Sequence, residues 1–144
     1  MSKYRIAEER LRKLLEGNPD LFTRGSLIGI EKESLRVTGE GDVVQTPHPL
    51  ALGSALTHRY ITTDFSEALL EFITPPYADM GDALGCMNDI HRFVYANLDD
   101  ELLWASSMPC KVAGDASVPL AEYGSSNVGT MKNVYRRGLG HRYG

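Results

Sequence analysis

Two short stretches of the chain alternate apolar residues with acidic ones. The acids are Glu31 and Glu33 in the first stretch and Asp64 and Glu71 in the second. Alternation with a period of two residues is typical of β-strands, whose successive side chains point to opposite faces of a sheet. Carboxylates within sheet strands are costly to bury unless a cation meets them. The pattern therefore predicts a sheet whose acidic side needs solvent or a cationic partner.

The acids of each stretch share one face of their expected strand. Glu31 and Glu33 lie two residues apart, so an extended chain separates their Cα atoms by about 6.6 Å and points both the same way. In the second stretch Glu67 and Glu71 share a face, and apolar residues between them form the other. We therefore expect the apolar face to lie on the core and the glutamate face to look into a cleft or solvent.

The acidic face has two interpretations. In the first, the carboxylates bind a divalent cation, and Mg²⁺ fits because it takes oxygen ligands together with substrate phosphates, which indicates phosphoryl chemistry. In the second, the two glutamates of the first stretch are solvated residues on the outer face of an edge hairpin. Lys32 and Arg36 are then their ion-pair partners. The spacing of the acids alone favours the second interpretation.

Hydrophobic spacing predicts an α+β fold in a single region of 144 residues, a length that suits one domain with a modest core. The expected elements are a helix over residues 7–15, strands over 27–37 and 43–46, a strand pair around Asp64 and Glu71, a helix over 80–98, a strand over 102–104 and a basic helix through 135–137. The helix over 80–98 repeats apolar residues at helical spacing, so we expect it to cover the sheet.

Charge is distributed unevenly along the chain, whose formal net charge is -4. Glu122 is the last acid, and the four basic residues that follow it give the final 22 residues +4 and the rest -8. Such a tail favours an anionic ligand or the acidic body of the protein. The first ten residues are too charged for a secretory signal, and no stretch is apolar enough to span a bilayer. We therefore expect a cytoplasmic protein without a membrane partner.

Long strings of this sequence carry a family resemblance. They are, in chain order, residues 29–37, 46–49, 51–58, 61–75 and 123–127. Together they resemble the amino-terminal region of proteobacterial glutamate–cysteine ligase, also called γ-glutamylcysteine synthetase, and the likeness runs from about residue 10 to the last residue. Such long, ungapped strings are far more specific than a short glycine motif. Residues 1–144 thus resemble one region, the amino-terminal part of a larger ligase catalytic domain.

The resemblance implies both a fold and a reaction. The implied fold is a curved antiparallel sheet with covering helices, similar to that of glutamine synthetase and here incomplete. The implied reaction joins the γ-carboxylate of L-glutamate to the amino group of L-cysteine through an acyl-phosphate, as the first step of glutathione biosynthesis. ATP is the co-substrate, and Mg²⁺ or Mn²⁺ neutralises the phosphates and the attacking carboxylate.

The resemblance also implies roles for individual residues. The implied metal ligands are Glu31, Glu33, Asp64 and Glu71. Two of them, Glu33 and Glu71, would also lie near the amino group of the substrate glutamate. Tyr135 resembles a residue lining the cysteine site, and Arg136 would bind a phosphate or carboxylate, although a solvated basic helix end is an alternative for Arg136.

The length of the chain bears on its activity. Enzymes of the family run to several hundred residues, so we expect an inactive fragment that supplies part of the active site and lacks the carboxy-terminal part of the enzyme. An alternative is a short protein that binds Mg²⁺ or glutamate without turnover. Another is a module that binds nucleic acid or a partner protein through the basic tail. Nucleic acid is disfavoured, because four basic residues without interleaved aromatic side chains make a poor footprint on an acidic body.

Overall fold

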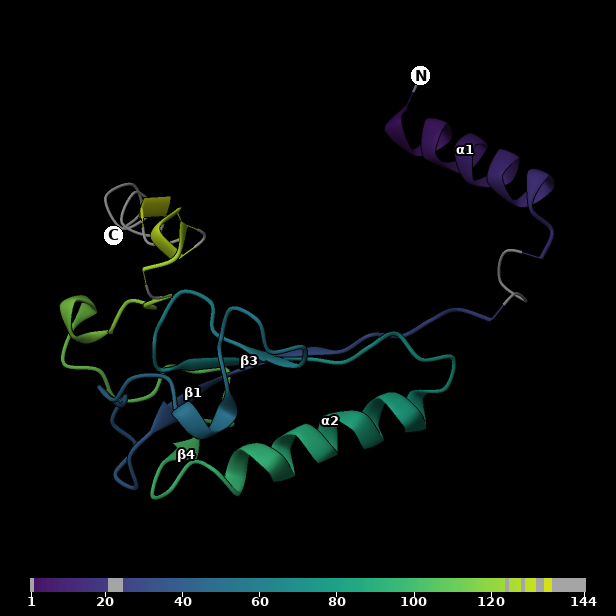
Figure 1. Cartoon of the computed structure of the whole chain (residues 1–144). Coiled ribbons are helices and arrows are strands. Elements are labelled where there is room, and N and C mark those ends of the chain that lie inside the picture. Colours follow the sequence, from purple (N-terminus) through teal and green to yellow (C-terminus); the bar gives the residue numbers. More distant parts are fainter. Residues whose placement is uncertain (1, 21–24, 124, 128, 132–133, 136–144) are drawn as a thin grey trace.

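A computed structural model describes residues 2–20, 25–123, 125–127, 129–131 and 134–135 of the chain (Figure 1). The helices are α1 (Lys3–Gly17) and α2 (Met80–Tyr95), with short 3₁₀ helices at Leu50–Leu52 and Asp115–Ser117. The strands are β1 (Glu31–Val37), β2 (Ile61–Thr62), β3 (Leu69–Ile73) and β4 (Leu102–Leu103). They form one sheet in the order β2-β3-β1-β4, with antiparallel pairing throughout. The predicted α+β fold with an antiparallel sheet is confirmed.

Strand β1 lies inside the sheet, between β3 and β4. The predicted return strand over 43–46 is reduced to a bridge between Val37 and Val43, because Val43 donates its amide hydrogen to the carbonyl of Lys111. The predicted strand over 27–37 is also shorter, since Ile28 pairs with Tyr77 apart from β3. The strand β4 flanks β1 only at Arg36 and Val37, so the edge position expected for Glu31 and Glu33 stays a prediction.

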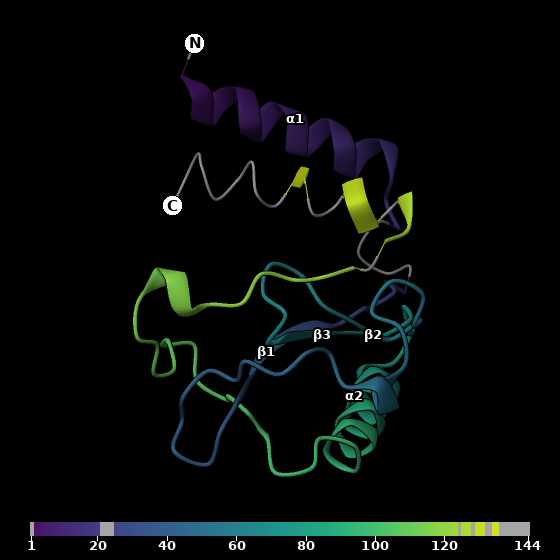
Figure 2. The same cartoon turned by 60° about the vertical axis from the view of Figure 1, so that its left-hand side comes forward.

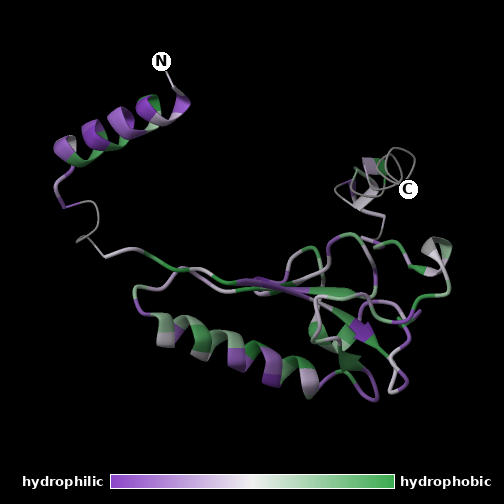
Figure 3. Cartoon of the chain, turned by 180° about the vertical axis from the view of Figure 1, so that it is seen from behind, coloured by the Kyte–Doolittle hydropathy of each residue, from purple (hydrophilic) through white to green (hydrophobic). Residues whose placement is uncertain are grey.

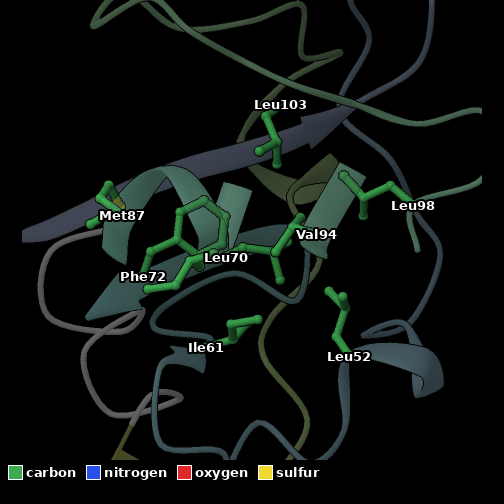
Figure 4. Packing of buried hydrophobic residues seen from close by; sticks show 9 residues of the cluster. Leu52, Ile61, Leu70, Phe72, Met87, Val94, Leu98 and Leu103 are labelled. Atoms are coloured by element: carbon green, nitrogen blue, oxygen red, sulfur yellow. The ribbon is translucent and has the colours of Figure 1, made fainter. Parts of the chain in front are cut away.

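Helix α2 covers one face of the sheet, as predicted (Figure 1). Asp79 caps it by accepting hydrogen bonds from the amides of Gly81 and Asp82, which have no partner within the helix. The apolar side chains of α2 pack on those of the strands in the core shown in Figure 4. This core comprises Leu52, Ile61, Leu70, Phe72, Met87, Ile90, Val94, Leu98 and Leu103. The helix ends at Tyr95, and the expected last turn to residue 98 is irregular but still contributes Leu98 to the core.

Helix α1 confirms the predicted first helix and extends it at both ends. Its N-cap is Ser2, whose side-chain oxygen accepts the amide of Tyr4. It has no buried residue, and Figures 1 and 3 show it standing apart from the sheet. Within the described ranges, no helix is both long and apolar enough to cross a membrane.

Candidate functional site

The acidic face of the sheet follows from the pairing of β1 with β3. The antiparallel register places Glu33 directly opposite Glu71, and Glu31 opposite Ile73. Residues opposed in this way share a face, with Cβ atoms about 4.5–5.5 Å apart. Phe72, the neighbour of Glu71 in β3, is buried in the core beneath α2 (Figure 4). The three glutamates, which we call the acid row, therefore point away from that helix.

The acid row concentrates negative charge on one side of the sheet. Glu31 and Glu33 are exposed and Glu71 is half-buried. Like charges directly opposite one another destabilise a sheet, so the pair of Glu33 and Glu71 favours a cation between or above the two carboxylates. The register agrees with the first interpretation of the sequence, a cation-binding face, which stays a prediction.

Asp64 lies in the loop that joins β2 to β3, two residues beyond the end of β2. The residue is exposed, and its carbonyl oxygen accepts a hydrogen bond from the hydroxyl of Tyr123 at 2.7 Å. Tyr123 is buried and reaches this loop from a segment 59 residues further along the chain. The structure thus holds Asp64 at the end of the sheet, while the other three predicted ligands form the acid row.

The carboxylates of the acid row are ligands of the kind that Mg²⁺ or Mn²⁺ takes, but they do not enclose an ion. Over the described ranges, no group of three or more histidine, cysteine, aspartate or glutamate side chains is arranged to hold a metal ion. Carboxylate oxygens are the ligands that Mg²⁺ prefers, and Mg²⁺ normally keeps several waters and substrate phosphates in its shell. A row of glutamates with an open side fits that requirement better than a closed cage of protein ligands would.

Lys32 and Arg36 do not neutralise the acid row. Lys32 donates to the hydroxyl of Ser34 and lies 5.6 Å from the centre of the Phe72 ring, and burial lowers the pKa of its amine. Arg36 is fully buried and pairs with Glu101 at 2.7 Å. Both therefore belong to the other face of β1, and the ion pairs expected by the edge-hairpin interpretation are wrong.

Glu67 is the main departure from the predicted glutamate face. It is 8% exposed, and its two carboxylate oxygens accept the backbone amides of His48 and Glu122 at 2.8 and 2.7 Å. The alternation fails here because the chain turns before β3 begins, with the amide of Leu69 bonded to the carbonyl of Ser66. The expectation that Glu67 faces a cleft or solvent is wrong.

The predicted substrate residues near the end of the chain are only partly described. Tyr135 lies in a helical stretch and is 66% exposed. Arg136 and Arg137 lie outside the described residues. The predicted roles of Tyr135 and Arg136 stay predictions.

His48 should make the stability of the chain depend on pH. Burial, and then the nearby charge of Arg36, lower the pKa of His48 from its ordinary value of 6.5, against the opposing charge of Glu67. The neutral ring is therefore favoured in the folded chain, and the unfolded chain binds the proton more readily. This contribution is fully present above about pH 6.5 and is lost as pH falls through the lowered folded pKa.

Urea unfolding of the chain from pH 7.5 down to pH 5 measures this effect. We expect His48→Gln to flatten the fall in unfolding free energy below pH 6.5. If the variant and the original chain lose stability in parallel, His48 is not the source of the dependence.

A separate hollow of about 630 Å³ lies between α2 and the edge of β2. Its lining includes Tyr60, Tyr77, Cys86 and Phe93. A hydrogen bond with the thiol of Cys86, and then burial, raise the pKa of Tyr77. Because the hollow lies on the side of the sheet that α2 covers, it is not part of the acid row.

Comparison with known proteins supplies a family. The family described as glutamate-cysteine ligase matches residues 11–144. A glutamate–cysteine ligase of Alcanivorax borkumensis is 58% identical over 137 residues, which are 95% of this chain and 26% of that protein. The chain spans about a quarter of the length of the curated relatives it matches.

Two solved structures have a fold similar to that of this chain. A glutamate–cysteine ligase from Francisella tularensis in complex with AMP aligns with a TM-score of 0.79 and 45% identity, over 83% of this chain and 24% of its own. A bifunctional glutathione synthetase from Pasteurella multocida aligns with a TM-score of 0.74 and 36% identity, over 91% of this chain and 17% of its own.

Proposed function

Because the chain belongs to the glutamate–cysteine ligase family, we propose that it supplies the metal- and glutamate-binding part of a ligase active site. In this proposal Glu31, Glu33, Asp64 and Glu71 are ligands of Mg²⁺ or Mn²⁺. Glu33 and Glu71 also receive the ammonium group of L-glutamate, which a pair of opposed carboxylates attracts. Tyr135 would line the cysteine site, and Arg136 would bind a phosphate or carboxylate.

The observation that carries the proposal is the register of β1 and β3. It opposes Glu33 to Glu71 and sets Glu31 beside them, on the face that α2 leaves uncovered. Such a face would attract a cationic ammonium group as well as divalent ions, because both relieve the repulsion among the glutamates. The AMP in the Francisella tularensis ligase supports an adenine nucleotide as the other ligand.

The proposed reaction proceeds in two steps. The γ-carboxylate of glutamate attacks the terminal phosphorus of ATP, forming an acyl-phosphate and releasing ADP. The amino group of L-cysteine then attacks the acyl carbon, forming the amide and releasing phosphate and a proton. When bound, the metal screens the repulsion between the carboxylate and the triphosphate and aligns them for transfer. The contribution of this chain is to hold the glutamate at the acid row in a fixed orientation.

A chimera tests the proposal in the context of a whole enzyme. The stretch of the Alcanivorax borkumensis ligase that matches this chain is replaced by the chain itself, and phosphate release from ATP is measured with glutamate and cysteine present. We expect turnover within about tenfold of the parent ligase, because the replaced residues are 58% identical. A folded chimera without glutamate- and cysteine-dependent phosphate release would contradict the proposal.

The isolated chain should be inactive. It spans about a quarter of its relatives, and the described residues present the acid row without enclosing a metal, so the remaining contacts to ATP must come from elsewhere. We expect no phosphate release from ATP that depends on both glutamate and cysteine, in the same assay as the chimera. Such release would favour a self-sufficient short enzyme. Binding of Mg²⁺ or glutamate without turnover agrees with the proposal.

A further inference from the structure

Glu67 is a buried carboxylate with both oxygens engaged by backbone amides. One oxygen accepts the amide of His48, and the other accepts the amide of Glu122. These partners lie 19 and 55 residues away along the chain, so a single side chain joins three distant segments. A buried carboxylate that binds two distant backbone amides in this way is an anchor, and its burial limits the access of a metal ion.

The first anchored segment is the loop that contains His48. Arg36, from β1, donates to the carbonyl oxygens of Thr46, Pro47 and Glu67 at 2.9, 3.1 and 2.9 Å. The loop is therefore held on one side by the guanidinium and on the other by the Glu67 carboxylate. Both holding groups are buried, which makes their hydrogen bonds costly to lose.

The second anchored segment, residues 119–123, runs on the side of the sheet away from α2 (Figure 2). It pairs with the chain just before β3, since the amide of Glu67 donates to the carbonyl of Pro119 and that of Ala121 to the carbonyl of Phe65. The hydroxyl of Tyr123 then contacts the carbonyl oxygens of Thr63 and Asp64 at 3.0 and 2.7 Å. The segment thus fixes the backbone that carries Asp64.

We infer that Glu67 is a positioning residue of the ligase site, which places Asp64 and the 119–123 segment relative to Glu33 and Glu71. This inference rests on the proposed function. Glu67 lies four residues before Glu71, so the anchor and the acid row belong to one continuous stretch of chain. A shift of about 1 Å in a reacting geometry can cost about 100-fold in rate, so a loose anchor is expected to lower turnover without removing any ligand.

The test compares Glu67→Gln with Glu71→Gln in the chimera. Glutamine keeps the size of the side chain but places an NH₂ group against an amide hydrogen that the carboxylate had accepted, so one anchored segment is released. We expect Glu67→Gln to lower kcat at least tenfold and to raise the Mg²⁺ concentration for half-maximal rate by much less than Glu71→Gln does, because it shifts Asp64 without removing a carboxylate ligand. We expect Glu71→Gln to raise that Mg²⁺ concentration at least tenfold. All rates are measured well below each variant's Tm.

The outcomes separate the inference from the proposed function. Unchanged kcat in Glu67→Gln would overturn the inference and leave the metal assignment intact. A rise in the Mg²⁺ requirement of Glu67→Gln equal to that of Glu71→Gln would also overturn it, because Glu67 would then act as a ligand. A further outcome is that Glu71→Gln leaves the Mg²⁺ requirement unchanged while Glu67→Gln lowers kcat as expected. In that case the metal assignment of Glu71 fails and the positioning role of Glu67 stands.

A second variant covers the case in which Glu67→Gln does not fold. Tyr123→Phe removes the hydroxyl that holds Asp64 and leaves Glu67 in place. The inference predicts a lower kcat and a smaller rise in the Mg²⁺ requirement than Glu71→Gln causes, and a wild-type kcat in this variant would overturn it. In the isolated chain, amide hydrogen exchange should be slow at His48 and Glu122, and fast exchange at both would show that the anchor does not form.

Discussion

Glu33→Gln in the chimera is expected to lower kcat by at least 100-fold. Glu33 stands opposite Glu71 on the face that α2 leaves uncovered. Removal of its charge deprives the metal of a ligand and the substrate ammonium of a partner. Metal ions supply several kcal/mol of transition-state stabilisation, and a loss of about 3 kcal/mol corresponds to about 100-fold in rate.

The fold should survive this substitution. Glu33 is exposed, and glutamine at this position relieves the repulsion with Glu71. The Tm is therefore expected to stay the same or to rise slightly. Glu40→Gln, in the exposed turn after β1, is the matched control and should retain wild-type kcat. Turnover within twofold of wild type in Glu33→Gln would defeat the ligand assignment.

Arg36→Met is expected to lower the free energy of unfolding by about 3 kcal/mol or more. The guanidinium is fully buried, pairs with Glu101 and donates to backbone carbonyls of Thr46, Pro47 and Glu67. Methionine fills a similar volume but leaves the carbonyls without this donor. The Glu101 carboxylate loses the guanidinium and keeps the hydroxyl of Thr46. Breaking a buried ion pair from one side typically costs about 3–5 kcal/mol, and partial exposure of Glu101 places this case toward the lower end.

Urea unfolding measures this loss, with Lys32→Met as the control. Lys32 is half-buried and donates to one hydroxyl, so its removal should cost about 1 kcal/mol or less. If Arg36→Met unfolds at the urea midpoint of the original chain, the buried network does not hold the loop that contains His48.

The features predicted correctly from the sequence depend on local spacing. Alternation identified β1 and β3, and the shared face of Glu31 and Glu33 follows from the two-residue period of a strand. Helical spacing identified α2 and its role as a cover for the sheet. The opposition of Glu33 to Glu71 could not be read from spacing, because register depends on how two distant strands pair.

The features that the sequence left hidden depend on contacts across long separations. Arg36 alternates with apolar residues as a surface residue of a strand would. Its burial depends on Glu101, 65 residues away, and on carbonyl oxygens of Thr46, Pro47 and Glu67, which spacing does not reveal. In the sequence, Glu67 continues the alternation of β3. In the structure, a turn at Ser66 directs its carboxylate toward the backbone amides of His48 and Glu122. The role of Glu67 was missed because its partners are backbone amides. Nearly every residue carries such an amide, so the sequence does not indicate which ones a carboxylate contacts.

Mn²⁺ titration of the isolated chain, followed by NMR, tests whether the acid row binds divalent cations. Paramagnetic Mn²⁺ broadens the amide signals of residues close to its binding site. We expect the earliest broadening around Glu31, Glu33 and Glu71, and we expect it to be lost in the double variant Glu33→Gln with Glu71→Gln. Broadening that begins elsewhere, or that persists in the double variant, would contradict cation binding by the acid row.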